Sequence, residues 1–189
     1  MDWIILIYLI VFFFGYFFLT IFLLLHFRHK NQLFSYPIPK RFPSLTFLVP
    51  AYNEEESIEE TVNALIELEY PEDKKFILII NDGSKDKTLE ISKRLEEKYS
   101  CVKILDKTNS GKANSLNDAL KIVDSELIAV TDADSYPKKD SVIKMIGYFE
   151  EEGVSAVTSR VLVKNKKNFL EKFQVLDYSI IAWSRKLLD

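Results

Sequence analysis

The strongest constraint in this sequence is an apolar run close to its first residue. Residues 3–25 contain no Asp, Glu, Lys, Arg or His, whereas charged residues are frequent beyond them. As a helix, the run would be roughly 34 Å long, against about 30 Å for the hydrocarbon core of a bilayer. A helix buried in a protein core needs an apolar surface on one side only, so we expect a transmembrane helix over residues 3–25. A cleaved signal peptide fits less well, since no basic residue precedes the run and no small-residue cleavage site follows it.

The charges that flank this run predict its orientation. Arg28, Lys30, Lys40 and Arg41 follow the run, and Asp2 is the charged residue before it. Because basic residues concentrate on the cytoplasmic side of a span, we expect a single-pass anchor in the cell membrane with the rest of the chain in the cytoplasm.

Composition excludes some classes of protein. The net charge is only -3 and acidic and basic residues are interspersed, so there is no electrostatic case for binding nucleic acid. A single cysteine, Cys101, cannot form an internal disulfide, which agrees with a reducing compartment. The 189 residues suffice for one compact domain and are too few for two large ones.

Beyond the apolar run, the pattern predicts a connector and then an α/β domain. Residues 26–43 contain three prolines, which argue against helix or central strand, and residues 44–189 form the expected domain. Short apolar runs then alternate with helical periodicity, as in βα units on a parallel sheet. The predicted strands are residues 45–49, 76–80, 102–105, 127–130 and 154–163. The predicted helices are residues 55–68, 87–99, a segment from 112 onward, 140–151 and 168–188.

Apolar residues at helical spacing mark the buried face of each predicted helix. The expected inward residues are Ile58, Val62, Leu65 and Ile66 in the first helix, Ile91 and Leu95 in the second, and Leu116, Leu120 and Val123 in the third. The last helix should be amphipathic, with Leu170, Phe173, Leu176, Ile180, Trp183 and Leu187 on one face.

Polar residues follow four of the predicted strands, where ligands of open α/β sheets bind. Asp132 and Asp134 follow the fourth strand. In an extended segment both carboxylates would project to the same side and repel each other, unless a cation lay between them. Mg²⁺ or Mn²⁺ would be the natural cation. Alternatively, Asp132 ends the strand and Asp134 caps a turn at residues 135–137.

Two of the other polar clusters also have ordinary structural interpretations. Asp82 follows the second strand, where it could line a site, or residues 81–83 could form a tight turn with Ser84 or Asp86 as the helix N-cap. Lys112 could place a cation and the amides of a helix start against a phosphate, or it could be a solvated lysine. The sequence is not a Walker A loop, because Ala113 replaces the Ser or Thr that follows the lysine there.

Taken in order, four segments resemble the family 2 glycosyltransferases. They are residues 49–55 (VPAYNEE), 81–86 (NDGSKD), 111–117 (GKANSLN) and 132–134 (DAD). The resemblance is to the membrane-anchored processive type, which includes hyaluronan, cellulose and poly-N-acetylglucosamine synthases. It covers roughly residues 43–189 and implies a GT-A-like (Rossmann-like) fold with a mostly parallel sheet flanked by helices.

The resemblance also implies roles for single residues. Donor-binding residues would be Pro50, Ala51, Tyr52, Glu54, Asp82, Lys112, Asp132 and Asp134. Within this set, Tyr52 and Glu54 would line the nucleotide pocket, Asp82 would bind the base and Lys112 would lie near the diphosphate. Asp132 and Asp134 would hold the metal. The donor would be a nucleotide-sugar, UDP-linked, and the acceptor a glycan or lipid.

One part of the family pattern has no match in this sequence. Inverting members use a carboxylate base on the acceptor side, from an acidic motif after the Asp-x-Asp pair, and processive members add a Gln-x-x-Arg-Trp segment. Gln174 is followed by Val175, Leu176 and Asp177, which does not match. The catalytic base is therefore unassigned, and a second chain could supply the acceptor site. The alternative is a catalytically silent nucleotide-sugar-binding membrane protein, or a gene fragment without that base.

Overall fold

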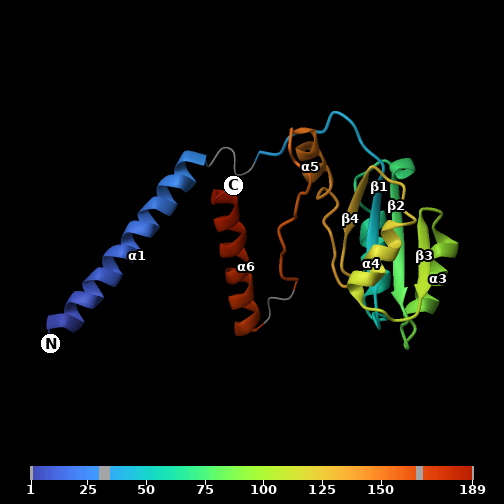
Figure 1. Cartoon of the computed structure of the whole chain (residues 1–189), viewed down its shortest axis with the longest axis horizontal. Helices are drawn as coiled ribbons and strands as arrows, with labels where there is room; N and C mark the ends of the chain where they lie inside the picture. Colours follow the sequence, from blue (N-terminus) through green and yellow to red (C-terminus); the bar gives the residue numbers. More distant parts are fainter. Residues whose placement is uncertain (1, 30–34, 165–167, 189) are drawn as a thin grey trace. The chain divides into compact units, whose positions relative to one another are not determined.

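The computed structural model describes residues 2–29, 35–164 and 168–188 (Figure 1). It divides into two compact units, of which one is Pro37–Val157 and the other combines Met1–Tyr36 with Thr158–Asp189. Each unit is described by itself.

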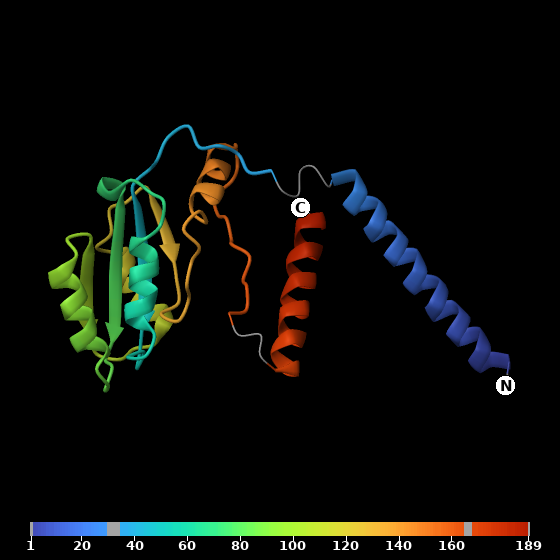
Figure 2. The same ribbon diagram turned by 180° about the vertical axis from the view of Figure 1, so that it is seen from behind.

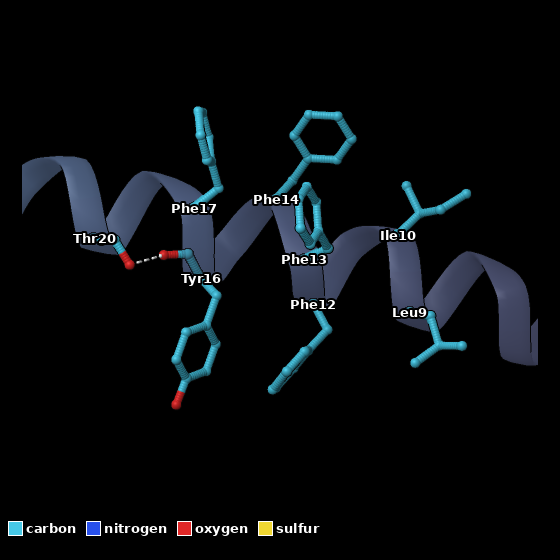
Figure 3. Close-up of a pocket in the computed structure, with 8 residues that line it drawn as sticks. All are labelled: Leu9, Ile10, Phe12, Phe13, Phe14, Tyr16, Phe17 and Thr20. Carbon is cyan, nitrogen blue, oxygen red and sulfur yellow. Dashed lines mark hydrogen bonds between the residues drawn. The ribbon is translucent and has the colours of Figure 1, made fainter.

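The apolar run forms helix α1 (Asp2–His29), which confirms the predicted helix and extends it at the carboxyl end. Within α1, Trp3–Arg28 is long and apolar enough to cross a membrane, a test that a signal sequence near the N-terminus also passes. One face of α1 has a shallow hollow between Leu9 and Thr20, lined by aromatic and aliphatic side chains of this helix alone (Figure 3). Of its two hydroxyl-bearing residues, Tyr16 and Thr20, the Thr20 hydroxyl donates to the Tyr16 carbonyl oxygen over 2.8 Å.

Four parallel strands form the sheet of the unit Pro37–Val157, in the order β3-β2-β1-β4. The strands are β1 (Leu45–Ala51), β2 (Lys75–Asp82), β3 (Val102–Lys107) and β4 (Leu127–Val130). The mostly parallel α/β fold is thus confirmed. Strands β1 and β2 are longer than predicted, because Pro50 and Ala51 pair with Ile80 and Asn81 where the sequence suggested turns.

Helices cover both faces of this sheet (Figures 1 and 2). Helices α2 (Ile58–Ile66) and α3 (Thr88–Lys98) lie on one face, where Val49 and Ile79 belong to the larger core cluster. Helix α4 (Lys112–Leu120) covers the other face, where Leu48 and Ile80 join the smaller cluster. Because alternate residues of a strand point to opposite faces, β1 and β2 are apolar on both sides, as their unbroken apolar sequences indicated.

The buried faces of the helices were predicted well for α2 and α3 and less well for α4. Val62, Leu65 and Leu95 are at most 3% exposed. In α4, however, the buried residues are Ser115 and Ala119, and Leu120 is 48% exposed, so its predicted inward position is wrong. Small residues face the sheet here, which brings this helix close to it.

Two predicted elements after β4 differ in the structure. The helix expected over residues 140–151 is reduced to α5 (Ile143–Ile146) and the 3₁₀ turn η2 (Gly147–Glu150). The strand expected over residues 154–163 is absent, and those residues carry no regular structure. Alternation of apolar residues describes a strand's faces but supplies no partner for its amide groups, and no described strand pairs with this segment. Helix α6 (Phe169–Leu188) confirms the last predicted helix, with Phe173, Leu176 and Ile180 exposed.

Much of the connector is bound to the amino edge of the sheet. Lys30, one of the orienting cations, lies outside the described residues, and α1 occupies the start of the predicted connector. Further along, the Tyr70 hydroxyl donates to the Pro43 carbonyl oxygen over 2.5 Å, and Arg41 pairs with Glu126 over 2.5 Å. Gly147 lies so close to the connector that a Cβ atom there would be 2.1 Å from the Pro37 carbonyl oxygen. The connector is therefore part of the folded unit from Pro37 onward.

A buried lysine closes the carboxyl end of α2. Lys75 is 3% exposed, and its ammonium group donates to the carbonyl oxygens of Ile66 and, over 3.0 Å, Leu68. The last carbonyls of a helix lack partners within it, so Lys75 supplies a donor to Ile66, whereas the Leu68 carbonyl oxygen also accepts the Tyr70 amide N–H over 2.8 Å. Burial lowers the pKa of Lys75. The carbonyl oxygens that accept its hydrogen bonds favour the charged form of the amine.

We expect Lys75→Met to lower the free energy of unfolding by about 1–3 kcal/mol, because it keeps the aliphatic chain but removes the lysine donor from the Ile66 carbonyl oxygen and one of two donors from the Leu68 carbonyl oxygen. Denaturant unfolding of the full chain in detergent, followed by circular dichroism, measures this. The matched control is Lys139→Met, which removes an exposed ion pair with Glu67 and should change stability by less than about 0.5 kcal/mol. Equal stability of the two variants would contradict the assignment of Lys75 as a helix cap.

Candidate nucleotide-sugar site

The parallel sheet brings four connecting segments to one edge. Because β1 to β4 run in the same direction, the segment after each strand lies at the carboxyl edge. We name them loop 1 (residues 52–57), loop 2 (83–87), loop 3 (108–111) and loop 4 (131–135). The parallel strand directions therefore bring the four loops to one edge, as the sequence predicted.

Loops 1 and 2 hold each other through hydrogen bonds. The Asn53 amide N–H donates to the Ser84 hydroxyl oxygen over 3.1 Å, and the Glu54 amide N–H donates to the Thr88 hydroxyl oxygen over 2.8 Å. The Glu54 carboxylate accepts a hydrogen bond from the Ser57 hydroxyl over 2.9 Å. Both loops therefore have a defined shape without a ligand.

Asp82 ties loop 3 to the end of β2. Its two carboxylate oxygens accept hydrogen bonds from the amide N–H groups of Ser110 (2.9 Å) and Gly111 (2.8 Å). Asp82 is the last residue of β2 and is 4% exposed, so the prediction that it stands in a turn is wrong. The neighbouring Asn81 is also buried and donates to the Asp106 carboxylate over 2.7 Å. Asp82 thus shapes the start of α4.

These contacts keep Asp82 ionised. Burial alone would raise the pKa of its carboxyl group, but hydrogen bonds from Ser110, Ser115 and Gly111 and the charge of Lys107 outweigh burial and lower the pKa. Among these, the Ser115 hydroxyl is buried and has no hydrogen bond of good geometry in the described part of the chain. The amide N–H groups of Ser110 and Gly111 are therefore the hydrogen-bond donors to Asp82 with good geometry.

Loops 3 and 4 meet through a pair of opposite charges. Lys112, the first residue of α4, forms an ion pair with the Asp132 carboxylate, and both side chains are more than half exposed. Gly111 precedes this lysine with φ 86°, a left-handed conformation that glycine adopts without strain. The structure therefore brings together two candidate residues that are far apart in the sequence.

The Asp-x-Asp segment turns back from the sheet. Strand β4 ends at Val130, and the Ser135 amide N–H donates to the Asp132 carbonyl oxygen over 3.0 Å. The extended geometry assumed for Asp132 and Asp134 is therefore wrong, since a strand conformation does not continue through a turn. Between them, Ala133 is buried, and its carbonyl oxygen accepts a hydrogen bond from the Thr61 hydroxyl of α2 over 2.7 Å. This bond fixes the turn while both aspartates remain exposed.

The donor set suits a hard divalent cation shared with a substrate. Asp132 and Asp134 supply carboxylate oxygens, and the described residues contain no group of three or more His, Cys, Asp or Glu side chains able to hold a metal. Mg²⁺ and Mn²⁺ commonly take one or two protein carboxylates and complete their shell with water and phosphate oxygens. The residues present fit such an ion in company with a phosphate ligand.

The remaining candidates occupy different environments at the end of β1. Ala51 is 2% exposed and belongs to the core, whereas Tyr52 is 44% exposed. Pro50 and Glu54 are partly buried. Of these residues, Tyr52 and Glu54 present side chains at the surface of loop 1, and Pro50 and Ala51 shape the strand that leads to it.

Two contributors escaped the sequence reasoning. Thr61 lies within a predicted helix, and its burial among apolar residues signals that its hydroxyl needs a partner. Asn53 lies in the segment 49–55 and has φ 57°, a region that Asn enters more readily than most residues. An Asn just after an apolar strand was the signal available for it.

This architecture, with its clustered polar loops, is that of the GT-A glycosyltransferases. Among solved structures, the mannosyltransferase PcManGT from Pyrobaculum calidifontis in complex with GDP-Man and Mn²⁺ is 30% identical, with a TM-score of 0.60, covering 70% of this chain and 41% of that one. S. aureus TarS 1-349 is 25% identical, with a TM-score of 0.52, covering 65% of this chain and 40% of that one.

Sequence comparison identifies the family. The sequence profile of Glycosyl transferase family 2 matches residues 46–186, and the chain belongs to this family. Poly-beta-1,6-N-acetyl-D-glucosamine synthase from Staphylococcus epidermidis is 36% identical over 138 residues, which are 72% of this chain and 33% of that protein. The enzyme of the same description from Staphylococcus aureus (strain COL) is 36% identical over 136 residues, 71% of this chain and 32% of that protein. The chain thus spans about a third of the length of these curated relatives.

We expect Asp82→Asn to flatten the acid side of the stability profile. The pKa of Asp82 is lowered from 3.8 in the folded chain, so its carboxylate contributes stability above that pH, and the contribution disappears as the pH falls through the lowered pKa. Unfolding free energies measured between pH 2 and 7 should therefore fall more steeply below about pH 4 in the wild type than in Asp82→Asn. Asp124→Asn, which removes an exposed carboxylate, is the control and should follow the wild type. Parallel profiles for all three proteins would contradict the prediction.

Proposed function

We propose that this chain binds the donor of a membrane-anchored glycosyltransferase, a nucleotide-sugar, at loops 1 to 4. The observation that carries the proposal is the contact between Lys112 and Asp132, in which a cation at a helix start meets the first carboxylate of the Asp-x-Asp segment at the carboxyl edge. A diphosphate requires this combination of fixed positive charge and metal ligands. Family membership supports the same reading.

The proposed donor is UDP-N-acetylglucosamine. The curated relatives at 36% identity are synthases of a polymer of N-acetyl-D-glucosamine, so their donor must carry that sugar. PcManGT, at 30% identity, was solved with GDP-Man and Mn²⁺, which supports a nucleotide-sugar together with a divalent cation but leaves a guanine nucleotide as the competing donor. The acceptor would be a growing glycan or a lipid.

Each residue of the site has a separate task in this proposal. Tyr52 and Glu54 line the nucleotide pocket, and Asp82 contacts the base while it holds loop 3. Lys112 leaves Asp132 to stabilise the diphosphate leaving group as a fixed cation. A bound Mg²⁺ or Mn²⁺, held by Asp134 and Asp132, would supply Lewis-acid stabilisation of the same negative charge.

Transfer with inversion would require a carboxylate base at the acceptor hydroxyl. None of the candidate residues has that role, so a further segment or a second chain would supply it. The competing function is a nucleotide-sugar-binding membrane protein without transferase activity. We further propose that α1 anchors the protein in the cell membrane with the site on the cytoplasmic side, which the basic residues Arg28, Lys40 and Arg41 favour.

A transfer assay with the full chain in detergent tests the proposed activity. UDP-N-acetylglucosamine and GDP-mannose are supplied in turn with Mn²⁺, Mg²⁺ or EDTA, and released nucleotide and sugar products are quantified by mass spectrometry. We expect metal-dependent turnover of the UDP-sugar. Metal-dependent binding of UDP without transfer or hydrolysis would favour the silent binder, and binding of neither nucleotide would refute the proposed site.

We expect Asp134→Ala and Asp132→Ala each to weaken metal-dependent UDP binding by at least tenfold, because each removes a proposed metal ligand. Isothermal titration calorimetry with UDP and Mn²⁺ measures the affinity, and circular dichroism should show the fold unchanged, since both side chains are exposed.

Asp140→Asn is the matched control for these variants. It breaks a surface ion pair with Lys144, outside the four loops, and should leave UDP affinity within twofold of the wild type. Wild-type affinity of the Asp132 and Asp134 variants would remove both residues from the metal site.

A further inference from the structure

Loops 1 and 2 are joined by hydrogen bonds in which each loop supplies both donors and acceptors. Loop 1 donates amide N–H groups from Asn53, Glu54 and Glu55 to loop 2 and the start of α3. The opposite loop donates amide N–H groups from Lys85 and Lys87 to side chains of loop 1. Each loop therefore satisfies backbone groups of the other.

Asn53 is the centre of one half of this arrangement. Its side-chain Oδ1 accepts the Lys85 amide N–H over 2.8 Å, while its own amide N–H donates to the Ser84 hydroxyl oxygen over 3.1 Å. The backbone of Asn53 has φ 57°, and it is the residue other than glycine with positive φ among those the structure describes. Such a conformation persists where surrounding contacts hold it, and here the side chain supplies one of them.

Asp86 is the centre of the other half. Its Oδ1 accepts hydrogen bonds from the Thr88 hydroxyl (2.6 Å) and amide N–H (3.0 Å), and its Oδ2 accepts the Glu55 amide N–H over 3.1 Å. The Thr88 hydroxyl is thereby oriented so that its oxygen can accept the Glu54 amide N–H. A chain of hydrogen bonds thus leads from the Asp86 carboxylate through Thr88 to the backbone of Glu54.

The ionised form of Asp86 suits this task. Burial opposes ionisation, but hydrogen bonds from the hydroxyl and amide of Thr88 and the amide of Glu55 outweigh it and lower the pKa of the Asp86 carboxyl group. A carboxylate accepts on both oxygens, whereas an asparagine would turn an N–H₂ group toward one of these donors.

Neither residue belongs to the proposed set of ligand contacts, but both adjoin it. Asn53 lies between Tyr52 and Glu54 in the sequence, and Asp86 acts on the Glu54 amide through Thr88. We propose that Asn53 and Asp86 are positioning residues that hold Tyr52 and Glu54 in the conformation that binds the nucleotide. This inference rests on the proposed function, because it assigns those two side chains to the donor pocket.

The expected effect follows from preorganisation. A loop that is already ordered loses little conformational entropy when the ligand binds, whereas a loosened loop must be ordered at the expense of affinity. We call the hydrogen bonds that Asn53 and Asp86 make between loops 1 and 2 the clamp. Loss of the clamp should weaken nucleotide binding more than it changes global stability, since the loops lie at the edge of the sheet and the core clusters remain intact.

Substitution of Asn53 can distinguish the role of its side-chain acceptor from the role of its backbone conformation. Glycine adopts φ 57° without strain but has no acceptor for the Lys85 amide, so Asn53→Gly should weaken UDP affinity about five- to twentyfold and lower the melting temperature by only a few degrees. Asn53→Asp keeps an acceptor oxygen and should restore affinity to within about threefold of the wild type. Rescue by Asp and failure of Gly would not arise if the residue only had to permit the turn.

Asp86→Asn and Thr88→Val test the second half. Each interrupts the hydrogen bonds that lead to Glu54, and each should weaken UDP affinity by a factor comparable to that of Asn53→Gly. The matched control is Asn63→Ala on α2, which removes a 3.3 Å hydrogen bond from the Tyr99 hydroxyl outside the loops and should leave affinity unchanged.

Hydrogen exchange distinguishes failure of the clamp from failure of the proposed function. In the wild type without ligand, the amides of Glu54, Glu55 and Lys85 should be protected, and Asn53→Gly should increase exchange at Lys85 and Glu54 by tenfold or more. Unchanged exchange and unchanged UDP affinity in Asn53→Gly would overturn the inference. A wild-type protein with protected amides that binds neither UDP nor GDP would instead refute the nucleotide site and leave the clamp without the role proposed for it.

Discussion

Everything at the candidate site depends on parallel pairing of β1 with β2 and with β4. The register aligns Leu45 with both Lys75 and Leu127, so the strands begin together at one edge and their following loops meet at the other. Burial of β1 and β2 on both faces stabilises this register, because a slip of one residue would reverse every side chain between two different helical layers. The position of the loops therefore follows from the packing of the core.

The four loops form a continuous series of contacts around that edge. Loop 1 is bound to loop 2, the last residue of β2 is bound to loop 3, and the first residue of α4 reaches loop 4. Loop 4 is bound in turn to α2 by the hydroxyl of Thr61, and α2 begins directly after loop 1. Most of these bonds join side chains to backbone amides or carbonyls, so loop shape depends on a few polar residues and not on apolar packing.

Periodic apolar patterns in the sequence predicted strands and helix faces, whereas contacts between residues far apart in the sequence were not predicted. Apolar runs identified all four strands of the sheet, and helical spacing identified the buried faces of α2 and α3. The ends of β1 and β2 were misjudged because Pro50 and Asn81 favour turns locally, whereas the ladder between neighbouring strands extends through them. The candidate residues Lys112 and Asp132 could be placed at the same edge, but their direct contact and the shared task of Asp82 depend on side-chain geometry that spacing does not encode. Asn81 donates to the Asp106 carboxylate, where an aspartate would place a second carboxylate and repel it.

The attachment of the connector has a mechanical consequence. Tyr70, Glu126 and Gly147 bind residues 37–44 at the amino edge, and the seven residues of β1 follow immediately. A pull on the chain at Pro37 would load these contacts first and then the two ladders of β1, along which many hydrogen bonds share the force. The loops stand roughly 23 Å further along the strand. A force applied at Pro37 would thus be shared by the sheet before it reached loops 1 to 4, so the geometry of these loops is isolated from the chain that precedes residue 37.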